Sequence, residues 1–148
     1  MGFTIFSDEH FMGEALKEAR LAAAEDEVPI GAVIVCNGKI IARAHNMTER
    51  LNDVTAHAEM IAITAAANFL GAKYLTDCTI YITVEPCPMC AAALGWAQIE
   101  KVVYGAGDPK RGYSLIQGRL LHPKTQVESG LRAKECSELM TGFFRTKR

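Results

Sequence analysis

The 148-residue chain has no long apolar run and almost no net charge, with 16 Lys and Arg against 17 Asp and Glu. No uninterrupted apolar stretch approaches the ~18 residues of a membrane span, so we expect no membrane partner. A formal charge of −1 gives no general attraction for nucleic acid, and any such partner would need a local basic patch. With 49% hydrophobic and 22% charged residues, the composition is typical of one folded domain, covering residues 1–148.

The chain also lacks an even set of cysteines, since it has five, two of them in one Cys-x-x-Cys pair. Cys36, Cys78 and Cys136 lie in apolar or helical contexts, where a reduced, packed thiol is the ordinary interpretation. No disulfide framework is indicated. The cysteines therefore favour a reducing compartment, the cytoplasm.

Apolar periodicity and turn residues predict helices alternating with strands. Ser7 or Asp8 can cap a first helix that ends before Pro29. Asn37-Gly38 between two β-prone runs predicts a hairpin of strands 32–36 and 39–43. The remaining predicted elements are strands at 79–84, 101–104 and 126–128 and helices at 56–70, 87–96 and 132–144. This order indicates an α/β fold with a mixed sheet of about five strands.

The predicted helices 56–70 and 87–96 are apolar or small on nearly all sides. Helices with little polar face are usually buried all round. We therefore expect both to pack on the sheet and against a partner subunit, with Trp96 buried.

Two short motifs carry the chemistry: His57-Ala58-Glu59, and Pro86-Cys87-Pro88-Met89-Cys90. His57, Cys87 and Cys90 are good zinc ligands, and three is one short of a closed tetrahedral site. An open fourth position is typical of catalytic rather than structural zinc. His57 and Glu59 would diverge inside a regular helix, so they can converge only on an ion beyond the helix end. We expect zinc between the N-terminal ends of two helices, each following a strand.

Glu59 is the one carboxylate in the motifs, and it is suited to moving protons. We expect it to take a proton from an attacking water and to return protons to a ring nitrogen and a departing amine. Each motif alone has a weaker meaning: His-x-Glu is common, and Pro-Cys-x-x-Cys occurs in redox pairs and in half of a zinc finger. Their combination, each after a strand and opening a helix, favours the catalytic interpretation.

The His-x-Glu…Pro-Cys-x-x-Cys arrangement resembles the zinc-dependent cytidine/deoxycytidylate deaminase superfamily. Further segments look like the bacterial tRNA wobble-adenosine deaminases: Val28 to Val33, Ala44 to Asn46, Val103 to Ala106 with Asp108, and Phe143 to Arg145. The segment after Asp108 is shorter than the family pattern. The resemblance implies a three-layer α/β/α fold, a homodimer and a tRNA anticodon loop as partner.

The resemblance also implies residue roles. His57, Cys87 and Cys90 would hold one Zn²⁺ per subunit, and Glu59 would carry protons. The implied substrate contacts are Asn46 to the purine, the Ala58 N–H orienting it, Ile30 lining the base pocket and Asp108 near the ribose. The candidate RNA contacts are Lys110, Arg111, Phe144 and Arg145.

Ordinary structural explanations exist for the weaker candidates. Asn46 is a frequent turn residue, and Asp108-Pro109 is a common turn initiator. For any single Lys or Arg, a solvated surface is the simpler explanation. Phe144 can equally pack on the core.

Three functions follow. The preferred hypothesis is hydrolytic deamination of adenosine to inosine at the tRNA wobble position, with release of ammonia. The second keeps the reaction and changes the substrate to a free base or nucleoside of guanine or cytosine type. The third is a non-catalytic, zinc-bearing RNA-binding subunit, against which Glu59 argues because a structural site needs no such carboxylate.

Overall fold

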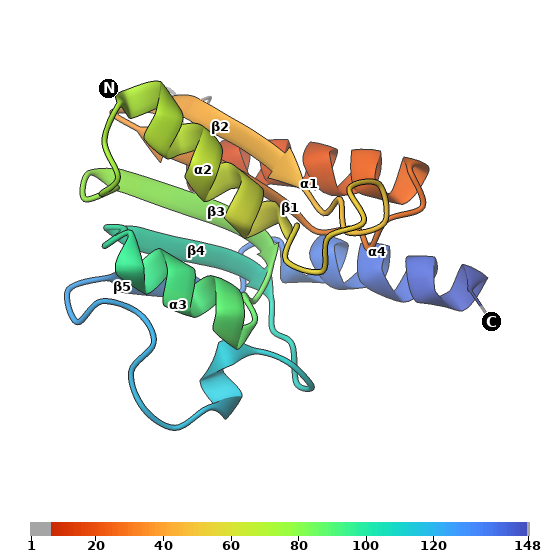
Figure 1. The fold of residues 1–148 in the computed structure, drawn as a ribbon. Coiled ribbons are helices and arrows are strands. Elements are labelled where there is room, and N and C mark those ends of the chain that lie inside the picture. The colour runs from red at the N-terminus through yellow and green to blue at the C-terminus, as the bar shows by residue number, and fades with distance from the viewer. Residues whose placement is uncertain (1–6, 148) are drawn as a thin grey trace.

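A computed structural model describes residues 7–147, which form a five-stranded sheet between two layers of helices (Figure 1). The strands are β1 (Gly31–Cys36), β2 (Lys39–His45), β3 (Cys78–Val84), β4 (Lys101–Ala106) and β5 (Gln126–Ser129). Their order in the sheet is β2-β1-β3-β4-β5. β1 is antiparallel to β2 and β3, whereas β3, β4 and β5 are parallel. The predicted mixed sheet is confirmed.

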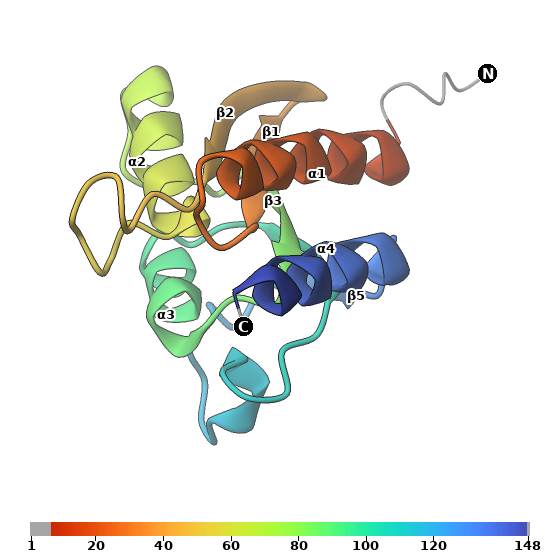
Figure 2. The ribbon, with the colours of Figure 1, turned by 90° about the vertical axis from the view of Figure 1, so that its right-hand side faces the viewer.

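The helices divide between the two faces of the sheet. Helices α1 (Asp8–Ala24) and α4 (Ala133–Thr146) cover one face, and α2 (Ala58–Leu70) and α3 (Pro88–Trp96) cover the other (Figures 1 and 2). Alternate strand residues serve the two cores, as the period of two requires. Ile80 and Ile82 lie in the core beneath α2 and α3, and Tyr81 lies in the core beneath α1 and α4. The predicted three-layer α/β/α architecture is confirmed.

Two local signals in the sequence act as expected. The Ser7 side chain caps α1 by accepting a hydrogen bond from the His10 N–H at 3.2 Å. Asn37 and Gly38 both have positive φ, 53° and 76°, which a two-residue turn between twisted strands requires. The β1–β2 hairpin therefore forms where it is predicted.

The strand register gathers four chain segments at one edge of the sheet. Gly31 pairs with His45, Ala32 with Ile82, and Val84 with Ala106. The segment before β1 and the segments after β2, β3 and β4 therefore leave the sheet at the same edge. Ligands of α/β sheets bind at the carboxyl ends of parallel strands, and this edge holds those ends of β3 and β4.

The bounds of most elements differ from the sequence-based expectation by one or two residues. Helix α2 begins at Ala58 rather than at residue 56, and α3 at Pro88 rather than at 87. Within one chain these helices are not buried all round, because Trp96 is 84% exposed and Phe69 on α2 is 68% exposed. Their expected burial against a partner subunit stays a prediction.

Outside the motif, Cys78 and Cys136 are buried, Cys36 is half-buried, and each has a free thiol. Within residues 7–147, no helix has the length and apolar character needed to cross a membrane.

Candidate metal centre and active site

Three potential metal donors meet where α2 and α3 begin. The His57 Nδ1 atom lies 3.7 Å from the Cys87 Sγ and 3.6 Å from the Cys90 Sγ, and all three donor atoms lie within 4.8 Å of one another. Tetrahedral zinc, with bonds of about 2.3 Å to sulfur and 2.0–2.1 Å to nitrogen, separates those ligands by about 3.6 Å. The donor set therefore fits zinc with three protein ligands.

The helix starts explain this convergence. His57 and Cys87 are the N-cap residues of α2 and α3, and both have extended backbone angles. Neither side chain caps its own helix, so both remain available to a metal. Cys90 follows in the first turn of α3. The positive ends of two helix dipoles meet here and favour negatively charged sulfur.

The surroundings of Cys87 favour the anionic form of its sulfur. Its hydrogen bond with Cys90 outweighs the effect of burial and, with His57 alongside, lowers the pKa of Cys87 to about 4. The thiolate, rather than the thiol, is the form that binds metal.

Glu59 lies in the first turn of α2 and is 3% exposed. Burial raises the pKa of Glu59 to about 7, an effect that its own backbone N–H only partly offsets. A carboxyl group with a pKa near neutrality can both accept and donate a proton at physiological pH. Its setting beside the metal donors therefore suits the proton transfer expected of it.

The predicted base-binding residues lie together next to this centre. The Asn46 N–H donates to the Ile30 carbonyl at 3.2 Å, and the Ala58 N–H donates to the Asn46 Oδ1 at 2.8 Å. Asn46 is buried, and Ile30 is partly buried. A purine that uses the Ala58 N–H must therefore share it with Asn46 or displace it, a competition that the sequence does not indicate.

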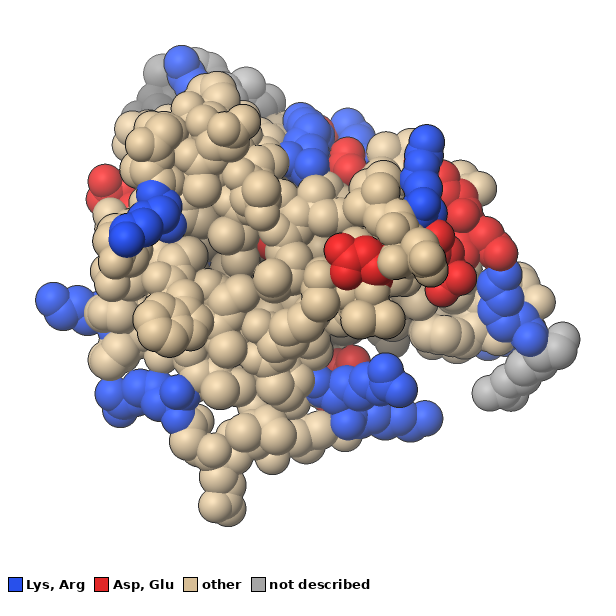
Figure 3. Space-filling view, viewed as in Figure 1, with Lys and Arg blue, Asp and Glu red and all other residues tan. Residues whose placement is uncertain are grey.

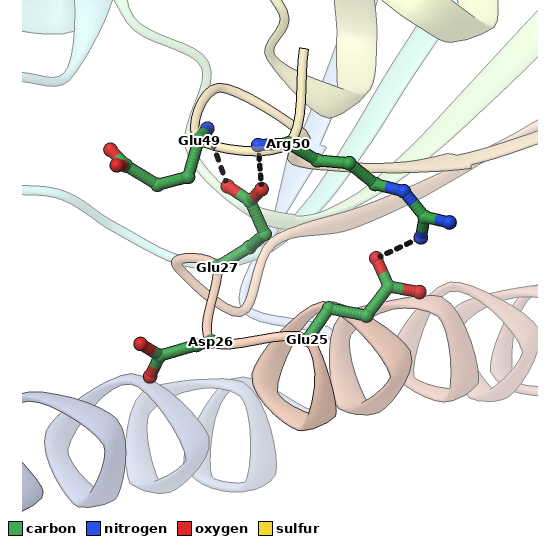
Figure 4. A pocket seen from close by; sticks show the side chains of 5 residues that line it. All are labelled: Glu25, Asp26, Glu27, Glu49 and Arg50. Atoms are coloured by element: carbon green, nitrogen blue, oxygen red, sulfur yellow. Dashed lines mark hydrogen bonds and ion pairs between the residues drawn. The ribbon is translucent and has the colours of Figure 1, made fainter. Parts of the chain in front are cut away.

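Sequence reasoning missed Glu27, which supports the loop between Asn46 and His57. It is 1% exposed, and its carboxylate accepts hydrogen bonds from the N–H groups of Glu49 (3.1 Å) and Arg50 (2.8 Å). Figure 4 shows the side chain directed at these groups, while the neighbouring Glu25 meets the Arg50 guanidinium at 3.3 Å. In sequence, Glu27 belongs to an acidic run that looks like ordinary surface.

Glu85 was missed in the same way. It is 7% exposed and accepts hydrogen bonds from the Asp108 N–H and from Ser114. Asp108 thus lies near the metal motif, and its own Oδ1 accepts from the N–H groups of Lys110 and Arg111 at 3.0 Å each. Asp108 therefore does initiate a turn, and its contact with a ribose stays a prediction.

The candidate RNA contacts lie in two places. Lys110 and Arg111 are exposed on the segment after β4, and Phe144 (46% exposed) and Arg145 lie near the end of α4. The C-terminal end of α4 lies at the same edge of the molecule as the N-terminal ends of α2 and α3 (Figures 1 and 2). In Figure 3, Lys and Arg side chains gather at the lower right, where the segment after β4 lies.

The family model for the cytidine and deoxycytidylate deaminase zinc-binding region matches residues 6–106. The chain belongs to this family. A tRNA-specific adenosine deaminase of Bacillus subtilis (strain 168) is 48% identical over 146 residues, covering 95% of this chain and 91% of the relative.

Two solved structures are also similar. One comes from biochemical and structural studies of A-to-I editing by tRNA:A34 deaminases at the wobble position of transfer RNA. Its sequence is 48% identical and its TM-score is 0.82, and the match covers 88% of this chain and 98% of the other chain. A guanine deaminase from Bacillus subtilis is 44% identical with a TM-score of 0.66, covering 68% and 65%.

The segment of this chain that the family model matches contains both metal motifs and Asn46, and it ends just before Gly107. The family model therefore supports the zinc-binding region. Asp108, Lys110 and Arg111, like the end of α4, lie beyond it.

Proposed function

We propose that this protein is a zinc-dependent hydrolase that converts adenosine to inosine at the wobble position of tRNA and releases ammonia. The observation that carries the proposal is the buried Glu59 beside the donor set of His57, Cys87 and Cys90. The high identity to a tRNA-specific adenosine deaminase over nearly the full length of both chains supports the substrate.

His57, Cys87 and Cys90 would hold one zinc ion per subunit, which when bound activates water for attack on a ring carbon. Glu59 accepts a proton from the water that attacks C6 of adenine and delivers it to the ring nitrogen. It then accepts the proton of the new hydroxyl group on C6 and delivers it to the amine, which departs as ammonia. Burial supports both halves of this cycle, because it brings the pKa of Glu59 close to neutral pH.

Asn46, Ala58 and Ile30 would bind the base, since they meet at the sheet edge next to the metal donors. Asp108 would lie near the ribose of the flipped nucleotide. Lys110, Arg111, Phe144 and Arg145 would contact the anticodon loop, with the cations supplying phosphate binding that weakens as salt rises. We assign the site of action to the cytoplasm because the proposed substrate is tRNA.

We also propose a homodimer in which α2 and α3 pack against a second copy. The support is the uncovered apolar surface on and beside these helices, because large exposed apolar patches mark interaction sites. Its residues are Leu51, Val54, Phe69, Leu70 and Trp96.

One parallel assay tests the function. The zinc-loaded protein is incubated with an anticodon stem-loop carrying adenosine at the wobble position, and separately with free guanine. We expect inosine in the stem-loop, weaker turnover at higher salt, and no xanthine. Xanthine without inosine would instead support a free-base deaminase, the alternative that the similarity to a guanine deaminase favours. Cytosine and free nucleosides complete the panel, and absence of ammonia from every substrate would indicate a non-catalytic RNA-binding subunit.

A further inference from the structure

Glu85 is a buried carboxylate for which the proposed reaction has no use. It is the first residue after β3 and lies two positions before Cys87. Its N–H donates to the Ala106 carbonyl at 2.8 Å, continuing the pairing of β3 with β4. Within residues 7–147, no Lys, Arg or His forms an ion pair with it. A buried charge is costly unless hydrogen bonds replace the lost water, so the donors around Glu85 matter.

Those donors come from both ends of one loop, residues 107–115. The Asp108 N–H donates to the Glu85 Oε1 at 3.0 Å. At the other end, the Ser114 N–H donates to Oε2 at 3.0 Å and the Ser114 hydroxyl at 2.6 Å. The two carboxylate oxygens thus bind the two ends of the loop separately. Hydrogen bonds to an ionised acceptor are shorter and stronger than neutral ones, which makes this a firm attachment.

The middle of the loop closes over the same carboxylate. A Cβ atom at Gly112 would lie 2.3–2.4 Å from the Glu85 carboxyl atoms, which only glycine avoids. The next residue, Tyr113, donates its N–H to the Pro86 carbonyl at 2.9 Å. The loop therefore packs against Glu85 and Pro86, the two residues that lead into the metal-binding Cys87.

We propose that Glu85 is a positioning residue, which holds the 107–115 loop in a fixed place relative to the metal motif. This inference rests on the proposed function, because it assigns the loop to the RNA substrate. The loop carries Asp108, Lys110 and Arg111, and the Asp108 carboxylate in turn fixes the backbone of the other two. Glu85 thus links the chemistry at Cys87 to the surface that binds the nucleotide and its flanking phosphates.

Glu85→Gln tests this with little change in volume. The amide keeps one acceptor oxygen and directs an NH₂ group at the N–H of Asp108 or of Ser114, so one end of the loop is released. With a wobble-adenosine stem-loop as substrate, we expect KM to rise about tenfold while kcat stays within about twofold, the pattern of lost substrate binding. Zinc content should remain one ion per chain. A second variant, Gly112→Ala, pushes the loop away from an intact Glu85 and should have the same effects.

Limited trypsin digestion of the native protein gives a readout that does not depend on activity. Releasing the loop should speed cleavage after Lys110 and Arg111 by about tenfold, since cleavage follows local opening. Glu27→Gln is the matched control, because it makes the same change in another buried carboxylate, which holds a different loop. It should speed cleavage after Arg50 and leave cleavage after Arg111 unchanged.

Two results would overturn the inference. In one, folded Glu85→Gln and Gly112→Ala variants show wild-type KM and wild-type cleavage at Arg111. In the other, both variants lose zinc and kcat together, which would make Glu85 a support of the metal motif. Should the wild-type protein fail to deaminate the stem-loop, the proposed function fails. The digestion then still decides whether Glu85 holds the loop.

Discussion

The Ala58 N–H donates a buried hydrogen bond of 2.8 Å to the side-chain oxygen of Asn46. This bond joins the residue after β2 to the first residue of α2, across the loop of residues 47–57. Asn46 therefore has a structural task in addition to its proposed contact with the base. It fixes the N-terminal end of α2, where His57 and Glu59 lie on either side of Ala58.

Asn46→Ala should therefore lower both stability and activity. Loss of the acceptor leaves the buried Ala58 N–H without a partner, which costs roughly 1–3 kcal/mol. Loss of the amide removes the proposed hydrogen bond to the purine, and we expect kcat/KM to fall by at least ~10²-fold. Urea denaturation measures the first effect, and stem-loop deamination measures the second.

Asn68→Ala is the matched control for Asn46, because it removes the same amide from an exposed position on α2. It should leave both quantities near wild type. An Asn46→Ala protein that is destabilised yet fully active would limit Asn46 to its structural task.

Glu59→Gln should separate proton transfer from metal binding. The amide preserves the shape of the buried side chain but cannot accept a proton, so we expect turnover to fall by at least ~10²-fold. Because glutamine removes a carboxyl group that burial disfavours in its charged form, the variant should be no less stable than wild type at pH 8. Zinc content by atomic absorption should stay at one ion per chain. Deamination at the wild-type rate would remove Glu59 from the mechanism.

Removing zinc should destabilise the protein, because the metal binds only the folded arrangement of His57, Cys87 and Cys90. At free zinc about 100-fold above Kd, binding adds about 2.7 kcal/mol to the free energy of unfolding. A chelator should abolish this stabilisation, and added zinc should restore it.

Cys90→Ser should lose zinc and activity. Cys36→Ser, at a half-buried cysteine outside the site, should retain both. A Cys90→Ser protein with full zinc would exclude the assigned ligand set.

The sequence predicts the features that depend on local patterns. The hairpin at Asn37-Gly38 and the α1 cap at Ser7 follow from short-range rules, and both are found. The convergence of His57 with two cysteines follows from the zinc-ligand chemistry of two motifs that each open a helix, and it is also found. The family resemblance adds the layer order. The apolar pattern of one chain cannot distinguish burial by its own fold from burial by a partner. Trp96, predicted to be buried, is exposed in the single chain, and its burial by a second copy stays a prediction.

Glu27 and Glu85 show a second limit of the sequence. Burial of an acidic residue depends on backbone N–H groups that arrive from distant loops: Asp108 and Ser114 lie more than 20 residues after Glu85. Nothing in the neighbouring residues indicates these donors. Hydrophobic periodicity in the sequence identifies the apolar faces of helices and strands. A carboxylate buried among backbone donors produces no such pattern.

His45 should make stability depend on pH. Its ring nitrogens lie 2.9 Å from Glu18 and 3.1 Å from Glu25. Burial opposes protonation, but these two carboxylates outweigh it and raise the pKa of His45. Stabilisation by a group with a raised pKa is complete below the unfolded pKa of about 6.5 and is lost as pH rises through the folded pKa.

The stability difference between wild type and His45→Gln should therefore be largest near pH 6 and shrink towards pH 9, as measured by urea denaturation. In a background carrying Glu18→Gln and Glu25→Gln, only the effect of burial remains, so the same substitution should show no such trend or the reverse one. With both carboxylates in place, a difference that grows as pH rises would contradict this assignment.

Trp96→Glu should convert the proposed homodimer to a monomer. Trp96 is 84% exposed at the end of α3. Loss of a buried aromatic residue near an interface centre typically costs about 2 kcal/mol or more, which corresponds to about a 30-fold rise in Kd. Because the substituted position is exposed in the single chain, the monomer should remain folded and bind zinc. Sedimentation velocity at micromolar concentration measures the change.

Val127→Glu, at a 41% exposed position on the edge strand β5, is the matched control and should remain dimeric. A wild-type protein that sediments as a monomer at every concentration would leave the apolar surface of α2 and α3 to a different partner.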